Sequence, residues 1–113
     1  MQTKLFIVFS LAVLLSSLSI VSAYEVTAWS GRVCSGVELG FLADDNNTPG
    51  LSAVEVTING QCITIDRDLP ADCDVYLCAD QACNDQGVTV DGPREAGQRV
   101  EGQSFSAIQV GCQ

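Results

Sequence analysis

The sequence contains no histidine and only one lysine, Lys4, among its 113 residues. Without histidine the chain cannot form a Ser-His or Cys-His catalytic pair, or a histidine-ligated metal site. Fourteen carboxylates oppose only five basic side chains. This balance excludes nucleic acids and anionic lipids as partners, because both are bound through lysine and arginine side chains that neutralise phosphates.

Long hydrophobic runs are also scarce, and the one that is present extends from Leu5 to Ile20. It follows the positive charge of Lys4 and is followed by the short segment 21–23, Val-Ser-Ala. This order is typical of a secretory signal peptide, here residues 1–23 with cleavage before Tyr24. The alternative is an uncleaved anchor, but the run is shorter than the ~20 residues that a spanning helix needs. We therefore expect a secreted, extracellular protein that is not inserted in a membrane after the signal peptide is removed.

The mature chain, residues 24–113, is expected to be a single cysteine-rich β domain. Its four arginines and fourteen carboxylates give a formal net charge of −10. In an oxidising compartment its six cysteines are expected to form three disulfides, and closing a loop of about 28 residues contributes roughly 3–4 kcal/mol. Zinc binding by the closely spaced cysteines is the alternative, and the spacing alone leaves fifteen pairings open. The cysteines are Cys34, Cys62, Cys73, Cys78, Cys83 and Cys112.

Short β-strands separated by turn residues are predicted along the mature chain, which is rich in Val, Ile, Thr and Gly and has no long stretch of helical period. Residues 94–102 are expected to form a loop or a weak edge strand. Seven or so such strands predict an all-β fold, a disulfide-stabilised antiparallel sandwich. The expected strands are 24–29, 37–41, 53–58, 61–65, 74–78, 87–90 and 104–110.

The clearest local signal is Asn59-Gly60 between two alternating apolar segments. This dipeptide predicts a β-hairpin with a type I′ turn, because both central residues of that turn need a positive φ. Counting outward from the turn places Val56 opposite Ile63 and Val54 opposite Ile65, with both pairs on the buried face.

Two pairs of segments indicate an internal repeat. Residues 26–34 resemble residues 75–83, and residues 52–56 resemble residues 106–110. The order of strand, cysteine, strand, loop and final strand is the same in both halves.

The first half also carries Tyr24, Trp29 and Gly31 in the pattern aromatic-x4-aromatic-x-Gly. This pattern resembles the Greek-key signature of βγ-crystallin domains, and the serine-led strand 52–56 resembles the strand that closes each such motif. The resemblance implies two Greek-key halves packed as a sandwich. Many family members bind calcium through an acidic pair, but the corresponding windows here lack that pair, so the calcium role does not carry over. The chain is also similar in style to small secreted cysteine-rich fungal proteins, including effectors and killer-toxin-like proteins.

The repeat suggests Cys34–Cys62 and Cys83–Cys112 as equivalent bridges within the two halves. The remaining pair would be Cys73 and Cys78. An extended strand between these two would hold their Cα atoms beyond the ~4.4–6.8 Å that a disulfide needs. Either that strand is broken or a bridge crosses between the halves.

Several polar or aromatic residues invite a functional interpretation. Residues 44–47, Asp-Asp-Asn-Asn, offer oxygen ligands for calcium but lack the spacing of an EF-hand. Asn46 begins a possible N-glycosylation sequon with Thr48. Trp29 could bind a sugar, although its place in the first strand favours the core. A pair of carboxylates could act as in a glycosidase, but so small a domain has little room for a sugar cleft.

No catalytic, cofactor-binding or metal-binding residue is therefore predicted. We expect a non-enzymatic secreted protein that acts by extracellular recognition, as effectors and toxins do, on an extracellular protein or glycan. A monomer is expected. The alternative is a calcium-stabilised extracellular structural protein like the βγ-crystallins, and a small hydrolase or protease inhibitor is supported only by size and cysteine content.

Overall fold

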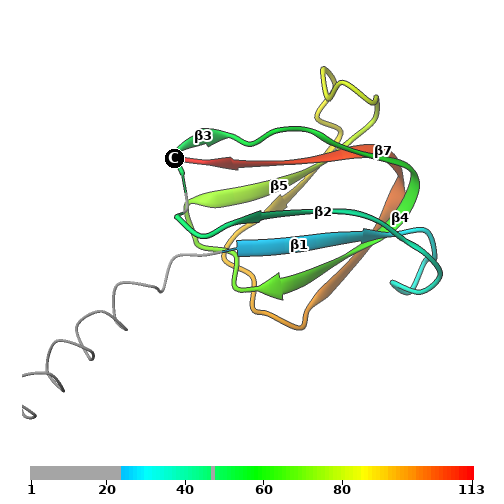
Figure 1. Ribbon diagram of the computed structural model, residues 1–113, viewed down its shortest axis with the longest axis horizontal. Coiled ribbons are helices and arrows are strands. Elements are labelled where there is room, and N and C mark those ends of the chain that lie inside the picture. Colours follow the sequence, from blue (N-terminus) through cyan, green and yellow to red (C-terminus); the bar gives the residue numbers. More distant parts are fainter. Residues whose placement is uncertain (1–23, 47) are drawn as a thin grey trace, which may run out of the picture.

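The computed structural model describes residues 24–46 and 48–113, which form seven β-strands and no helix (Figure 1). All strand pairs are antiparallel, which confirms the predicted all-β class. The predicted signal peptide, residues 1–23, lies outside the described residues. The strands are β1 (Tyr24–Trp29), β2 (Glu38–Asp44), β3 (Gly50–Leu51), β4 (Glu55–Arg67), β5 (Cys73–Cys78), β6 (Val88–Asp91) and β7 (Arg99–Cys112).

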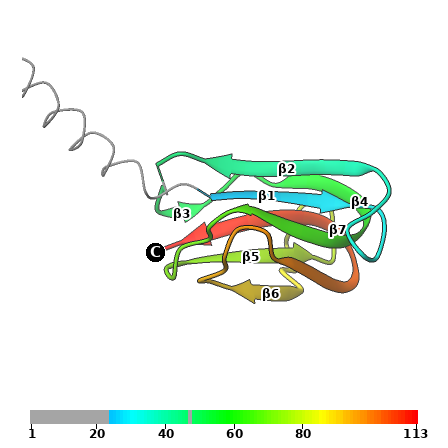
Figure 2. The same cartoon turned by 90° about the horizontal axis from the view of Figure 1, so that it is seen from below.

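The strands form one hydrogen-bonded sheet in the order β2-β1-β4-β7-β5-β6, with β3 paired to β7 (Figures 1 and 2). The sheet is continuous because β4 and β7 are long, curved strands. Residues 62–64 of β4 pair with residues 99–101 of β7, whereas residues 55–56 pair with 107–108 further along both strands. The expectation of a loop or weak edge strand over 94–102 was therefore wrong from Arg99 onward, because these residues begin β7, which lies between β4 and β5 in the sheet. The division into two Greek-key halves packed as a sandwich stays a prediction.

The Asn59-Gly60 dipeptide does not form the predicted hairpin. The chain continues through it as part of β4 without reversing. Asn59 has a φ of 62°, and the register with β7 shifts on both sides of Gly60. Such an irregularity bends a strand instead of ending it. The hairpin prediction was wrong because the positive φ at Asn59 serves a bend within β4.

Gly60 is required at this bend by close packing. A Cβ atom at Gly60 would lie 2.2 Å from Cε2 of Phe105, whose ring is buried. The small residue therefore admits the aromatic ring of β7 against the backbone of β4. This contact holds the curved parts of the two long strands together.

The core is made by inward side chains of β1, β4, β5 and β7, with Leu39 and Leu42 of β2 packed against it. A single buried face on 37–41 was expected, but Val37 and Phe41 are exposed, at 66% and 54%. The reason is a register shift between β1 and β2 near Ala28, which interrupts the alternation of β2. The largest fully buried side chains of the core are Ile63, Ile65, Leu69, Ile108, Val26, Val75 and Val110.

Three disulfides join the six cysteines. Cys34–Cys62 is confirmed, with a Cα–Cα distance of 4.9 Å. The predicted Cys83–Cys112 bridge is wrong, because β5 and β7 pair in a register that sets Cys73 opposite Cys112. Cys83 is bonded to Cys78 instead. The extended strand between Cys73 and Cys78 is present as β5, so those two cysteines are held apart. The expectation that this strand is broken or that a bridge crosses between the halves was nevertheless wrong, because Cys73–Cys112 and Cys78–Cys83 both lie within the second half.

Candidate functional site

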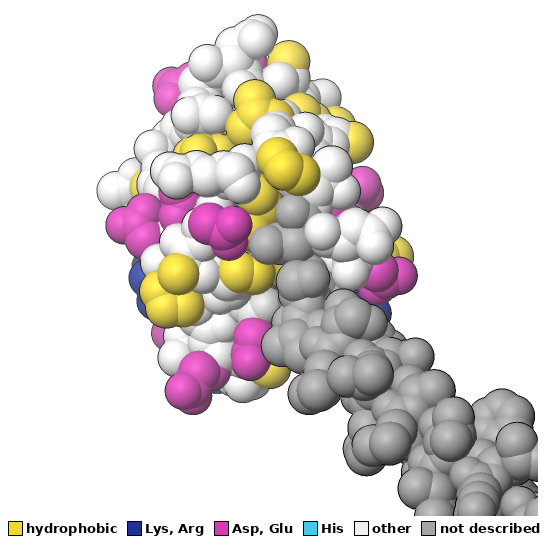
Figure 3. Space-filling view, turned by 90° about the vertical axis from the view of Figure 1, so that its left-hand side faces the viewer, with side chains coloured by type: hydrophobic (Ala, Val, Ile, Leu, Met, Phe, Trp, Pro, Cys, Tyr) yellow, Lys and Arg dark blue, Asp and Glu magenta, His cyan; other side chains and the backbone are white. Residues whose placement is uncertain are grey.

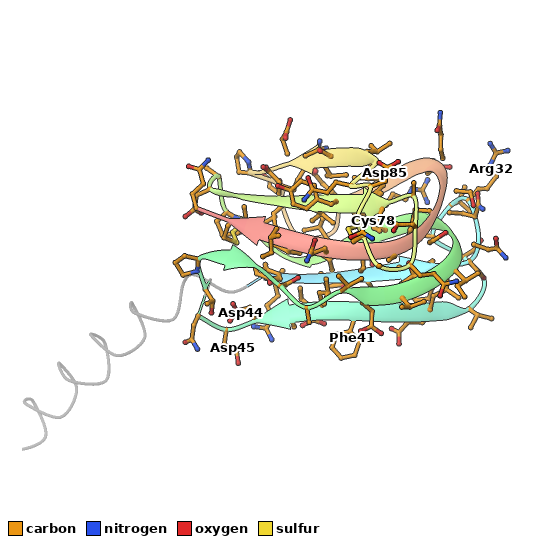
Figure 4. The ribbon with its side chains drawn as sticks, turned by 90° about the horizontal axis from the view of Figure 1, so that it is seen from above. Arg32, Phe41, Asp44, Asp45, Cys78 and Asp85 are labelled. Atoms are coloured by element: carbon orange, nitrogen blue, oxygen red, sulfur yellow. A yellow bond between two sulfur atoms is a disulfide. The ribbon has the colours of Figure 1, made fainter. Side chains whose placement is uncertain are left out.

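The candidate site is an apolar surface on the outer side of the sheet, made by β3, β5, the first half of β4 and the segment 52–54 between β3 and β4. Leu51, Val56 and Ile58 are exposed by 61%, 45% and 52%, and Val54 and Tyr76 are partly buried beside them. Figure 4 looks onto this side of the molecule, where β6, β5, β7 and the first half of β4 lie in sequence. We call these five residues the apolar face.

Strand alternation brings these side chains to one side. Residues 107, 109 and 111 of β7 point to the same side of the sheet, because successive side chains alternate. Val56 is opposite Ala107, Tyr76 is opposite Gln109, and Leu51 is opposite Gly111. Within β4, Val56 and Ile58 point outward while Thr57 between them is buried.

A small second core lies on the same side of the sheet and packs against two members of the apolar face. It consists of the Cys78–Cys83 disulfide and Ala107, with Val54 and Tyr76 packed against it. The disulfide also fixes the base of the 79–87 loop, which projects from the sheet in Figure 1. Val54 and Tyr76, the partly buried members of the apolar face, therefore pack against a part of the chain that a disulfide cross-links.

Side-chain hydrogen bonds hold the segment between β3 and β4 in place. The buried Gln109 donates from Nε2 to the Ser52 carbonyl oxygen at 2.9 Å, and the Val110 N–H donates to Ser52 Oγ at 2.9 Å. The Ser52 N–H donates to the Val110 carbonyl oxygen at 2.8 Å. The residues that lead from Leu51 to Val54 are thus tied to β7.

A shallow hollow of about 260 Å³ lies at one end of the apolar face. It is lined by Leu51, Tyr76, Gly111, Asp72 and Asp74, among others. A Cβ on Gly111 would lie 2.9 Å from the ring of Tyr76 and 3.1 Å from Cδ2 of Leu51. The glycine therefore lets both side chains lie close to the sheet and leaves the hollow open.

The charges near the apolar face are negative. Asp72 and Asp74 line the hollow, and Asp80 and Asp85 belong to the 79–87 loop that the supporting disulfide fixes. In that loop, the Asp80 carboxylate accepts hydrogen bonds from the backbone N–H groups of residues 84 and 85. These hydrogen bonds give the loop a defined conformation. Figure 3 shows hydrophobic side chains along the middle of the end that carries β3, with carboxylates on both sides.

Trp29 lies outside the core, contrary to the expectation from its place in the first strand. Its side chain is partly buried, and the indole N–H donates to Thr64 Oγ1 at 3.0 Å. The pairing of β1 with β4 puts Trp29 and Thr64 on the same side of the sheet, away from the two buried clusters. Trp29 is a partly covered surface residue, and it does not belong to the apolar face.

The loop proposed for calcium or glycan attachment begins at the end of β2. The Asp44 carboxylate accepts the N–H groups of Asn46 and Thr48 at 2.9 and 2.8 Å, and these hydrogen bonds lower the pKa of Asp44. Burial raises the pKa of Tyr24, and the neighbouring Asp44 charge raises it further. Asn46 is exposed, as an acceptor asparagine must be. Over residues 24–46 and 48–113, no group of three or more acidic, cysteine or histidine side chains could hold a metal ion.

The apolar face was missed in the sequence because Val54 and Val56 were assigned to the buried side of a hairpin. The signal that could have revealed it is the continued alternation of 54, 56 and 58, if Asn59-Gly60 is interpreted as a bend. In the part of the chain that is described, no helix is long and apolar enough to cross a membrane. Comparisons with protein-family models, curated proteins and solved structures found no match.

Proposed function

We propose that this protein is exported and acts outside the cell by binding another molecule through the apolar face, without catalysing a reaction. The observation that carries the proposal is the exposure of Leu51, Val56 and Ile58 together on one side of a cross-linked sheet. A contiguous apolar surface on a soluble protein usually marks an interaction site.

Rigidity favours binding at this surface. The Cys73–Cys112 and Cys78–Cys83 bridges hold β5, β7 and the adjoining loop, and Gln109 ties the β3–β4 segment to β7. A surface that is already ordered loses little conformational entropy when a partner binds. Full burial of one aliphatic side chain is worth roughly 1.5–3 kcal/mol, so a few such side chains suffice for specific recognition.

Three disulfides in a small domain support an extracellular location, because such bonds persist in oxidising compartments. The same bridges would keep the sheet folded where no chaperone system is present. This setting suits a recognition protein of the effector or toxin kind.

The proposal is tested with labelled, oxidised mature protein applied to intact cells and immobilised cell-surface glycans. The variant V56T/I58T keeps the β-branched shape of both residues while reducing their apolar surface. We expect it to lower binding about tenfold, since two partly exposed side chains lose roughly 1 kcal/mol in total or slightly more.

The matched control is V33T/V88T. These valines are exposed to a similar degree, 51% and 45%, but lie in the β1–β2 loop and on β6. We expect this control to bind like the parent. Equal binding by V56T/I58T and the parent, or turnover of a glycan or peptide substrate by the purified protein, would contradict the proposed function.

A further inference from the structure

We infer that the apolar face binds a positively charged polypeptide segment that also carries apolar side chains. This inference rests on the proposed function and specifies the chemistry of the partner. It depends on the distribution of charge around the apolar face, which is independent of the exposure of the aliphatic residues.

Carboxylates stand at both ends of the apolar face. Asp72 and Asp74 line the hollow next to Leu51 and Tyr76. At the other end, Asp85 and Asp80 belong to the loop fixed by the Cys78–Cys83 bridge, and Figure 4 shows Asp85 near the labelled Cys78. A ligand that covers the aliphatic side chains therefore comes close to negative charge at either end.

The arginines of the described chain are all engaged or placed elsewhere. Arg67 forms ion pairs with Glu25 and Asp45 at 3.3 and 3.0 Å. Arg99 donates to the Val33 carbonyl oxygen at 3.2 Å, and Arg94 donates to the Asp91 carbonyl oxygen at 2.9 Å.

The fourth arginine, Arg32, lines a separate cavity together with Val33, Gln61, Glu101 and Gly102. None of these contacts includes a residue of the apolar face, so the carboxylates around the apolar face are not balanced by an arginine there.

This charge pattern selects among the possible occupants. A second copy of the chain would bring the same carboxylates against Asp72 and Asp74, and like charges brought together at an interface cost affinity. Anionic lipids and nucleic acids are repelled for the same reason. Four of the five side chains in the apolar face are aliphatic, and the ring of Tyr76 is partly buried, so the surface offers little for stacking a sugar. A basic polypeptide with apolar side chains complements both the aliphatic and the acidic parts.

The probes are three fluorescent octapeptides whose binding is measured by anisotropy. One alternates leucine with lysine, one alternates leucine with glutamate, and one alternates serine with lysine. We expect the leucine-lysine peptide to bind most tightly, and to lose affinity as NaCl rises from about 50 mM to about 500 mM, because salt screens exposed charges.

Charge variants test the position of the carboxylates. D72N/D74N removes two charges at the hollow, while each asparagine keeps an oxygen acceptor. At position 74 this oxygen can still accept the hydrogen bond that the Gly92 N–H donates to Asp74. E38Q/E95Q removes two exposed charges elsewhere and changes the net charge equally. Each exposed charge pair contributes about 1.5- to 5-fold, so we expect D72N/D74N to weaken binding of the leucine-lysine peptide by roughly two- to 25-fold. We expect E38Q/E95Q to weaken it much less.

The apolar contribution is tested with V56T/I58T, which should lower affinity for the same peptide about tenfold. Absence of leucine-lysine binding, equal binding of the leucine-glutamate peptide, or equal effects of D72N/D74N and E38Q/E95Q would overturn the inference. If V56T/I58T still lowers binding to cells about tenfold in any of those cases, the proposed function stands and only the cationic partner is rejected. If V56T/I58T binds cells like the parent, the proposed function itself fails.

Discussion

Replacing Gly60 with alanine is expected to destabilise the protein through a collision in the core. The new Cβ would lie 2.2, 2.6 and 2.7 Å from Cε2, Cζ and Cδ2 of Phe105. Phe105 is only 2% exposed and is packed within the main cluster, so its ring has little freedom to move. Overpacking of this kind costs typically 1–3 kcal/mol. For a domain of this size, 2 kcal/mol lowers the Tm by about 8–16 °C, which thermal unfolding followed by circular dichroism measures easily.

A double-mutant cycle separates this collision from a backbone effect. Phe105→Leu removes part of the ring and is destabilising by itself, but it makes room for the methyl group of Gly60→Ala. We therefore expect the double variant to be more stable than the sum of the single effects predicts, by about 0.5–3 kcal/mol. In a type I′ hairpin, the cost of Gly60→Ala would come from its positive φ and would not depend on Phe105. Additive effects would refute the bend in β4.

Three further outcomes are expected. Thr57→Val should raise the Tm, because within the described chain Thr57 Oγ1 is buried without a hydrogen-bond partner. An unsatisfied buried polar group costs about 1–3 kcal/mol. A lower Tm of the variant would show that the hydroxyl is hydrogen-bonded in the protein. C78S/C83S should cost about 2 kcal/mol in the chain-entropy model, since the bridge spans a separation of 5 residues, and denaturant unfolding of the oxidised variant measures this loss. Asp44→Asn should lower the Tm at pH 6, but progressively less as the pH falls below about 4. The reason is that the lowered pKa of Asp44 contributes stability above the pKa of the unfolded state, and this stability is lost when Asp44 is protonated. A Tm difference that is constant from pH 6 to pH 2 would contradict this role.

Local patterns predicted the strands well where alternation and turn residues agreed. Residues 24–29 form β1 within the predicted bounds, and 74–78 and 87–90 correspond closely to β5 and β6. The Cys34–Cys62 bridge followed from the comparison of the two halves. For the three strands, the information needed lies within a few neighbouring residues, which is why short-range rules sufficed.

The errors arose where a distant strand decides the conformation. Asn59-Gly60 has the local signature of a turn, but Phe105 fills the space above Gly60 and β7 pairs with β4 on both sides of it. The pairing of Cys73 with Cys112 likewise depends on the register between β5 and β7. No pattern confined to one segment contains either register.

The apolar face could be foreseen only in part. The alternation of Val54 and Val56 was visible, but its assignment to the inner or outer side depended on the path of β4 through the bend. The contribution of Tyr76 and the position of Asp72 and Asp74 required the order of β3, β7 and β5 in the sheet. Strand order is set by contacts between residues far apart in the chain, so the surface appears only in the folded protein.

The apolar face requires that Cys73 be joined to Cys112 and Cys78 to Cys83. Peptide mapping of the unreduced protein tests this pairing directly. A protease that cleaves before aspartate separates all six cysteines, because an aspartate lies between each consecutive pair. Mass spectrometry should then find linked peptides that contain Cys34 with Cys62 and the two pairs named above. A peptide that links Cys83 to Cys112, or cysteines recovered with free thiols, would contradict the support proposed for this surface.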